Sequence, residues 1–263
     1  MSKDKDNSSF DSSYIEGRNS VNEALNADRE INKIWILKPA DGRRLEPDLA
    51  KILNAANEKK IVVVRLSRQA LDKMSATGNH QGVIAQVASH EYVDIEDIVA
   101  KAEEEGRTPL LIALDEIKDS FNFASLLRIS DAAGVDGIII PKHRSVALNS
   151  VVSKLSAGAI EYIPVARVTN LAQTLRKLKE EHGFWVCGTD MEGSVSYDKA
   201  DYSGPLVIIV GSEGEGMRKG IRNECDFMVH IPMYGHVNSL NAAVATGIIV
   251  YEAVKYRNSK NES

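Results

Sequence analysis

Residues 206–217 read LVIIVGSEGEGM, in which five apolar residues run directly into a glycine-rich turn that carries two acidic residues. A short apolar run rich in β-branched residues is typical of a strand buried on both faces of a sheet. Glycines placed directly after such a strand let the backbone approach a ligand closely. The stretch therefore predicts one strand of an α/β sheet, ending where a ligand binds.

Similar apolar runs recur on both sides of this stretch, and helical patterns separate them. Strands that alternate with helices predict a parallel sheet covered on two sides, so the fold class is α/β. In such sheets ligands bind beyond the carboxyl ends of the strands. The other runs are LLIALDEI (110–117), GIIIP (137–141), YIPVARV (162–168), FWVCGTD (184–190) and FMVHIP (227–232). The helical patterns cover residues 122–133, 149–157, 171–181, 216–224 and 239–256.

A smaller unit precedes this sheet. Residues 14–88 alternate helical and strand patterns and predict a small α/β domain with a mixed sheet. We expect residues 1–13, which are polar, to be a disordered tail, and residues 89–107 to be an acidic linker or a solvated helix face. The parallel sheet would then occupy residues 108–263.

Composition and charge narrow the class of protein. The chain has 263 residues, no apolar run near the ~20 residues of a membrane span, and no apolar signal segment at its N-terminus. Its two cysteines predict neither a disulfide framework nor a metal site. We therefore expect a cytoplasmic protein that contacts no membrane. The net charge is −5, but residues 89–107 hold seven acidic against two basic residues, so composition permits RNA binding without predicting it.

Three loops at the predicted carboxyl ends carry the functional hypothesis. The first reads DEIKDSFNFASLLR, residues 115–128. Asn122 is expected to be the N-cap of the helix that follows. Arg128 lies about 100° from the apolar stripe of that helix. It is either a surface arginine in a salt bridge or a guanidinium in the cleft, able to hold a phosphate or a carboxylate.

The second loop is the glycine turn GSEGEG, residues 211–216. It lacks the lysine of a phosphate loop and the spacing of a dinucleotide-binding turn. Glu213 and Glu215 would repel a phosphate, and they suit a cationic ligand or an arginine partner instead. A sulfonium ion with an α-amino group is one such cation. The alternative is a sharp turn with solvated acids.

The third loop, IPMYGHVNSLN at residues 231–241, leads into a helix that is apolar almost all round. Such a helix is expected to be buried or at an interface. Asn241 would lie in its first turn, where an unpaired amide costs roughly 1–3 kcal/mol. Asn241 therefore needs a partner, unless it is an ordinary helix cap.

Together, and in this order and spacing, the loops resemble the three signature motifs of the SpoU/TrmH RNA 2'-O-ribose methyltransferases. They match D-P-x-N-x-G-x-x-x-R, G-x-E-G-x-G and I-P-M…S-L-N-x-x-x-A, respectively. Asn19 and the HQGV run at 80–83 further resemble the bacterial 23S rRNA guanosine-2'-O-methyltransferase branch. The chain departs from the family at Ser120 and Ala124, where Pro and Gly are usual, and at residues 242–243, where Ala-Ala replaces Val-Ser.

This resemblance implies a SPOUT-type parallel-sheet domain with a C-terminal trefoil knot, preceded by an RNA-binding domain like ribosomal protein L30e. It implies S-adenosylmethionine as the cofactor, RNA (above all 23S rRNA) as the partner, and neither DNA nor a metal. It also implies a homodimer formed by the C-terminal domain, in which each copy contributes to the other's site. The implied catalytic residues are Arg128, Asn122, Glu213, Ser239 and Asn241. The implied cofactor-binding residues are Gly188, Thr189, Gly211, Glu213, Gly216, Ile231, Met233, Ser239 and Leu240.

Other functions stay open on the sequence. The same chemistry on a tRNA, or on the rRNA site of thiostrepton resistance, is one alternative. An RNA-binding or ribosome-assembly factor that has lost catalysis is another, and it would show no methyl transfer on any RNA. A nucleotide-dependent oxidoreductase is disfavoured, because no GxGxxG turn follows the first strand of either unit.

Overall fold

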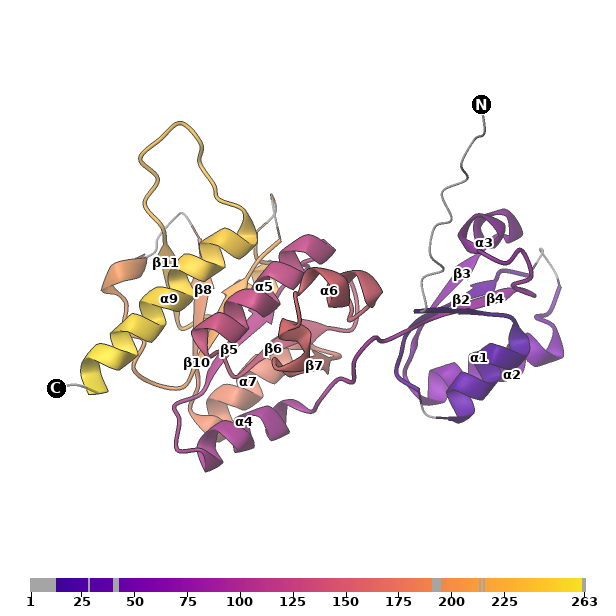
Figure 1. Cartoon of the computed structure of the whole chain (residues 1–263), viewed down its shortest axis with the longest axis horizontal. Coiled ribbons are helices and arrows are strands. Elements are labelled where there is room, and N and C mark those ends of the chain that lie inside the picture. The colour runs from indigo at the N-terminus through magenta and orange to yellow at the C-terminus, as the bar shows by residue number, and fades with distance from the viewer. Residues whose placement is uncertain are drawn as a thin grey trace. The chain divides into compact units, whose positions relative to one another are not determined.

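The computed structural model describes residues 13–27, 29–39, 43–190, 195–212, 214 and 216–261 (Figure 1). The chain divides into two compact units. The first comprises the chain up to His90 together with residues 148–150, and the second comprises the remainder.

The first unit is built on a four-stranded sheet, as far as the structure describes it. Its elements are β1 (Tyr14–Glu16), α1 (Arg18–Asn26), β2 (Ile31–Leu37), α2 (Pro47–Glu58), β3 (Val62–Leu66), α3 (Arg68–Met74) and β4 (Val83–Val87). The strand order is β1-β4-β2-β3, with β4 antiparallel to β1 and β2, and β2 parallel to β3. Alternate residues of β2, Ile34 and Ile36, form an apolar core with α1 and α2. The predicted small α/β domain with a mixed sheet is confirmed.

The HQGV run forms the turn that leads into β4. The His80 side chain is buried, its Nδ1 accepts a hydrogen bond from the Gly82 amide at 2.9 Å, and its Nε2 lies 2.9 Å from Asp72 Oδ1. Nδ1 is therefore the acceptor, and the proton lies on Nε2. Gly82 has a φ of +85°, which suits glycine.

The second unit contains a parallel sheet of seven strands in the described residues, in the order β7-β6-β5-β10-β8-β11-β9. The predicted strands all form, and β9 is a short addition. The strands are β5 (Leu110–Leu114), β6 (Gly137–Pro141), β7 (Val165–Val168), β8 (Trp185–Thr189), β9 (Val195–Ser196), β10 (Leu206–Val210) and β11 (Phe227–His230). The helices are α4 (Ile95–Glu104), α5 (Ser120–Ala133), α6 (Ser150–Leu155), α7 (Leu171–His182), α8 (Lys219–Arg222) and α9 (Ala242–Asn261), with two short 3-10 turns, η1 (Ala159–Glu161) and η2 (Tyr197–Lys199).

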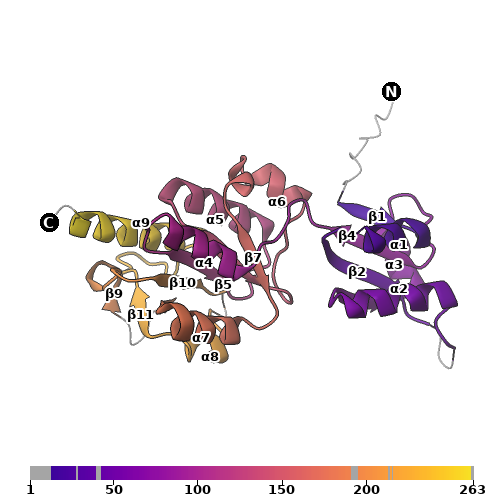
Figure 2. The same ribbon diagram turned by 90° about the horizontal axis from the view of Figure 1, so that it is seen from below.

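Helices cover both faces of this sheet. Leu111, Ala113, Val207 and Ile209 pack in one apolar core with α4, α7 and α8, which lie in front of the strands in Figure 2. Because side chains alternate along a strand, the residues between them face the other way. There α5 and α9 pack side by side (Figure 1). This arrangement is the predicted two-sided α/β sheet.

From Glu91 onward, the acidic stretch 89–107 belongs to the second unit. We expected a linker or a solvated helix face there, and the structure has the helix α4 with Ile95, Ile98, Val99 and Ala102 in the core of the parallel sheet. The acidic side chains occupy the remaining, exposed sides of that helix, which explains how a strongly acidic segment packs on a core.

Two helices differ most in length from their sequence patterns. The stretch 216–224 is helical only over α8, because the turn ahead of it is a backbone-paired loop. The apolar helix begins at Ala242 and continues to Asn261. Residues 231–241 form a loop that extends away from the sheet (Figure 1). The trefoil knot implied by the resemblance stays a prediction. In the part of the chain that is described, no helix is long and apolar enough to cross a membrane.

Candidate functional site

A cavity of about 760 Å³ lies beyond the carboxyl ends of β8 and β10 and beside the start of α9. A smaller cavity of about 170 Å³ continues past the end of β11, and the two cavities share Thr189, Asp190, Ser239, Leu240 and Ala245. The carboxyl edge of the parallel sheet is where the sequence placed the ligand site.

The glycine turn forms one wall of the larger cavity. Ser212 and Gly216 exchange two backbone hydrogen bonds, of 3.1 and 3.0 Å, and the Ser212 hydroxyl donates to the Gly216 carbonyl at 3.2 Å. A Cβ atom on Gly211 would lie 2.6 Å from the Gly216 carbonyl carbon and 2.7 Å from the Met217 nitrogen. Both contacts are with backbone, so only glycine fits at position 211 without moving the wall of the cavity.

The starts of α5 and α9 are joined by their asparagines. Asn241 Nδ2 donates a hydrogen bond to Asn122 Oδ1 over 2.7 Å, and Asn241 Oδ1 accepts from the amides of Ala243 and Val244. Asn241 is thus both the cap of α9 and the partner of Asn122. The two alternatives offered by the sequence are both realised.

Asn122 is not the N-cap that the sequence predicted. The cap is Asp119, whose carboxylate accepts the amide hydrogen of Asn122 at 2.8 Å, and α5 begins at Ser120. A carboxylate at this position also interacts favourably with the helix dipole, which explains the earlier start. The Asn122 side chain is thereby released to meet Asn241.

Most of the cofactor-binding residues implied by the resemblance lie around these cavities. Gly188 stands apart, because it is buried within β8, where a Cβ would collide with Met228, Cys225 and Met217. Glu213, like Glu215, lies outside the described residues. Those that line one or both cavities are Thr189, Gly211, Gly216, Ile231, Met233, Ser239 and Leu240.

Arg128 is exposed on α5, six residues or roughly 9 Å of helix beyond Asn122. It forms no ion pair with any other residue that the structure describes. The described residues therefore include no partner for the salt bridge that the surface interpretation of Arg128 requires. Its catalytic role stays a prediction.

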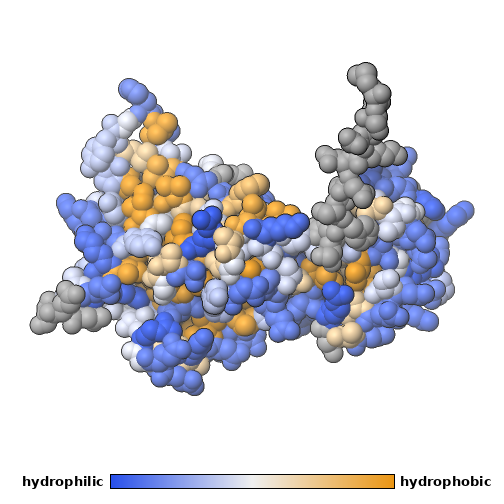
Figure 3. Space-filling model, viewed as in Figure 1, coloured by the Kyte–Doolittle hydropathy of each residue, from blue (hydrophilic) through white to orange (hydrophobic). Residues whose placement is uncertain are grey.

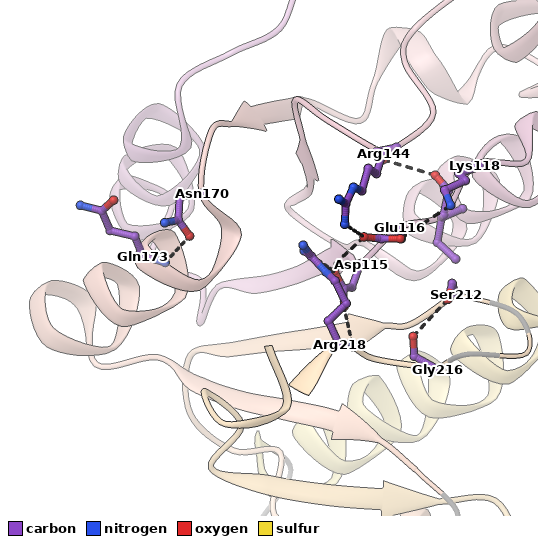
Figure 4. Close-up of polar contacts among 11 residues, drawn as sticks. Asp115, Glu116, Lys118, Arg144, Asn170, Gln173, Ser212, Gly216 and Arg218 are labelled. Atoms are coloured by element: carbon purple, nitrogen blue, oxygen red, sulfur yellow. Dashed lines mark hydrogen bonds and ion pairs between the residues drawn. The ribbon is translucent and has the colours of Figure 1, made fainter. Parts of the chain in front are cut away.

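A cluster of charged residues beside the site was not identified from the sequence. Asp115 is fully buried at the end of β5, and its carboxylate accepts hydrogen bonds from the Arg218 amide at 2.8 Å and from Arg218 Nε at 2.7 Å (Figure 4). These bonds connect the first loop to Arg218, which lies just after the glycine turn. The sequence feature that could have identified this cluster is the pair of acidic residues directly after an apolar strand, in LLIALDE (110–116).

Glu116 extends this cluster. Its carboxylate lies 3.4 Å from Arg144 Nη1, 3.5 Å from Arg218 Nε and 3.6 Å from Lys118 Nζ (Figure 4). Burial raises the pKa of Glu116, but the hydrogen bond from Arg144 and the charges of Arg218 and Lys118 outweigh it. The pKa therefore lies below its ordinary value.

Asp190 is a second residue that the sequence reasoning missed. It follows β8 directly, lines both cavities and forms an ion pair with Arg222 of α8. Its position at the carboxyl end of a parallel strand was the signal that could have found it. Asp190 supplies a carboxylate among the described cavity residues, whereas the predicted acids of the glycine turn lie outside them.

Comparisons with known proteins give the same assignment for both units. The model of the SpoU rRNA Methylase family matches residues 109–251, and a model described as RNA 2'-O ribose methyltransferase substrate binding matches residues 14–93. The chain belongs to the SpoU family. It is an S-adenosylmethionine-dependent RNA 2'-O-methyltransferase of the SpoU/TrmH kind.

Two of the similar proteins match this SpoU-family enzyme over nearly its whole length, and a third matches about two thirds of it. YacO of Bacillus subtilis, named for the TrmH family of tRNA/rRNA methyltransferases, is 43% identical over 95% of this chain and 98% of its own. The AdoMet-bound rRNA methyltransferase of Sinorhizobium meliloti is 25% identical, with a TM-score of 0.57 over 92% of this chain and 87% of its own. A TrmH/SpoU tRNA modifying enzyme of A. aeolicus is 31% identical over 63% of this chain and 85% of its own, with a TM-score of 0.54.

The residues present in the SpoU domain fit S-adenosylmethionine. The cavity has a backbone wall that only glycine permits at position 211, apolar side chains from Leu240, Met217 and Ala245, and a carboxylate at Asp190. This mixture suits a ligand with an apolar ring and a cationic end. The backbone around Gly211 and the residues Thr189, Ile231, Met233 and Leu240 would hold it.

Proposed function

We propose that this SpoU-family enzyme methylates the ribose 2'-OH of a guanosine in 23S rRNA, in the cytoplasm. Two things support an rRNA target: the N-terminal unit matches a substrate-binding domain, and its HQGV turn and Asn19 resemble the 23S branch, which carries an L30e-like domain. The names of its relatives include both tRNA and rRNA, so a tRNA 2'-OH is the alternative substrate.

The observation that carries the proposal is the bond between Asn241 and Asn122. It brings the first and third loops together, and Asn241 also lines the larger cavity with the second loop. Three segments that lie far apart in the sequence thus meet at the carboxyl edge of one sheet, where the family places its reaction. We propose that Asn122, Asn241 and Ser239 form the pocket around the reacting ribose.

Bound S-adenosylmethionine supplies an electrophilic methyl group. The ribose 2'-OH is a weak nucleophile, so the chain must position it and help its proton to leave. An arginine stays protonated in proteins and is therefore a poor base. We therefore assign Arg128 to orienting the 2'-OH and its phosphate while the proton passes to a neighbour, and Glu213 to fixing the Arg128 guanidinium.

The proposed active form is a homodimer through the SpoU domain. Phe121 on α5 and Val244 and Tyr251 on α9 are 65%, 52% and 52% exposed, on helices that pack together. Apolar side chains gather on the face that carries these helices (Figure 3). Exposed apolar patches of this kind mark protein interfaces. In such a dimer Arg128, exposed on α5, would serve the cavity of the partner subunit.

Mapping 2'-O-methyl marks in rRNA and tRNA, from cells with and without this protein, tests the function. We expect one guanosine mark in 23S rRNA to disappear without the protein and to return with the wild-type gene. Loss of a tRNA mark instead would favour the alternative substrate. Unchanged marks in both RNA pools would overturn the proposal.

A further inference from the structure

A third cavity, separate from the two described above, lies at the carboxyl ends of β6 and β7. It measures about 830 Å³ and is lined in part by His143, Arg144, Thr169, Asn170 and Arg218. None of the described residues that line it is acidic, and it shares no lining residue with the cavities of the cofactor site. Residues of the segment 217–222 line both this cavity and the larger cavity of the cofactor site, so these two cavities are neighbours.

Both arginines of this cavity interact with carboxylates that do not line it. Arg218 is fixed by the fully buried Asp115, and Arg144 by Glu116, at 3.4 Å from its Nη1 (Figure 4). The Arg144 side chain is still 72% exposed, and that of Arg218 is 45% exposed. Each guanidinium is therefore anchored at one edge and accessible at another, which leaves donors for a further ligand.

The backbone beneath the Arg144–Glu116 pair is strained on both sides. Arg144 has a φ of +57° and Glu116 a φ of +61°, a left-handed conformation that is unfavourable for residues other than glycine. Two strained residues that face each other across an ion pair hold the Arg144 side chain at the cavity. Strain of this kind concentrates where a side chain must be placed for function.

The N-terminus of α7 also opens into the cavity. Asn170 accepts the Gln173 amide hydrogen, and the first two residues of this 12-residue helix, Leu171 and Ala172, are among the lining residues. The first amides of a helix have no partner within the helix, and its dipole favours an anion there. These donors act in addition to the two arginines.

We propose that this cavity binds a phosphate group of the RNA backbone next to the methylated nucleotide. The inference rests on the proposed RNA substrate. S-adenosylmethionine carries no phosphate, so two arginines and a helix N-terminus serve a different ligand, and RNA presents one phosphate per nucleotide. The planar fork of arginine matches phosphate oxygens in pairs. The neighbouring position lets one strand reach both cavities.

The test uses the exposed Arg144, because substituting Arg218 would leave the buried Asp115 without its partner. Binding of a short fluorescein-labelled single-stranded RNA to the full chain is measured by anisotropy over a range of KCl concentrations. For Arg144→Gln we expect about tenfold weaker binding at low salt. The slope of log affinity against log salt should become less steep by about 0.7. Calorimetry should show S-adenosylmethionine affinity unchanged.

Arg176→Gln is the matched control. Arg176 lies on α7 outside the cavity, is 57% exposed and pairs with Glu224, so this variant removes the same charge from an arginine that also pairs with a glutamate but does not line the cavity. Its salt slope should equal that of the wild type. Equal slopes for wild type and Arg144→Gln, or equal losses in both variants, would overturn the inference.

Inorganic phosphate, titrated at constant ionic strength, separates two sources of the anion. Phosphate should displace the RNA from the wild type more effectively than from Arg144→Gln. Phosphate binding that depends on Arg144, with unchanged RNA binding, would assign the cavity to a free anion and contradict an RNA site. Methyl transfer by wild type with no change of slope in Arg144→Gln would leave the proposed function standing and reject this inference alone. A changed slope in a protein that methylates no RNA would support the phosphate site and reject the proposed function.

Discussion

Asn241 Nδ2 lies 2.7 Å from Asn122 Oδ1, although 119 residues separate the two asparagines in the sequence. Because Asn241 Oδ1 accepts two amides of α9, the orientation of its side-chain amide is fixed, and it presents a donor to Asn122. One side chain thereby caps a helix and joins the first and third loops of the site.

The first prediction concerns this pair. Asn241→Ala removes a helix cap, at about 0.5–2 kcal/mol. It also leaves Asn122 Oδ1 without this donor. In a double-mutant cycle with Asn122→Ala, urea unfolding should therefore give a coupling free energy of about 0.5–1.5 kcal/mol. Asn170→Ala, which removes the cap of α7, is the control and should be additive with Asn122→Ala. Additivity of the Asn122 and Asn241 substitutions would show that the bond contributes nothing.

Arg128→Ala should abolish methyl transfer while S-adenosylmethionine affinity stays within a few-fold of wild type. The side chain is exposed and has no ion pair among the described residues, so its removal leaves none of those residues with an unpaired buried charge. Radiometric transfer to RNA and calorimetric titration of the cofactor measure the two effects. Equal loss of both would contradict a role confined to the RNA substrate. Arg176→Ala, on the other face of the sheet, should retain activity.

Gly211→Ala should weaken S-adenosylmethionine binding about tenfold or more. Its Cβ would lie 2.6 Å from the Gly216 carbonyl carbon, and relieving such a backbone contact costs about 1–3 kcal/mol. Gly220→Ala is the matched control, because a Cβ there meets nothing within 4 Å. Calorimetry on both variants checks the prediction. Unchanged affinity in Gly211→Ala would mean that the glycine turn is not a wall of the cofactor site.

Acid should destabilise the SpoU domain through Glu116. A carboxyl group whose pKa is lower in the folded than in the unfolded chain takes up protons more readily when unfolded. The stability it contributes is therefore present above its ordinary pKa of 4.5 and is lost as the pH falls through the lower, folded value. Urea midpoints at several pH values should fall less steeply below pH 4.5 for Glu116→Gln than for wild type. Glu104→Gln, an exposed acid of α4, should follow the wild-type curve.

Tyr251→Arg should convert the proposed dimer to a monomer. The substitution places a charge on the exposed apolar side of α9, where association would have to desolvate it. Light scattering after size-exclusion chromatography measures the mass. Trp185→Arg, at a side chain 56% exposed on β8, is the control and should leave the mass unchanged. A wild-type monomer at all concentrations would reject the dimer outright.

The two-sided parallel sheet followed from the sequence because its signal is local. Six apolar runs separated by helical patterns are readable one at a time, and their strands end at ligand-binding loops by the geometry of parallel sheets. The motif order selected three loops; the second and third line the cavities, and the first is joined to the third by the bond between Asn122 and Asn241. By contrast, α4 was obscured because its acidic exposed side dominates the composition of residues 89–107.

The sequence alone determined the strands, the glycine turn and the requirement that Asn241 be paired, since each depends on residues close together in the chain. Tertiary structure alone decided that Asn122 is the partner of Asn241, and that Asp115 and Glu116 hold Arg218 and Arg144. Those contacts join residues about 30 to 120 positions apart. Which donor meets which acceptor there depends on how the strands are ordered in the sheet, and that order has no local signature.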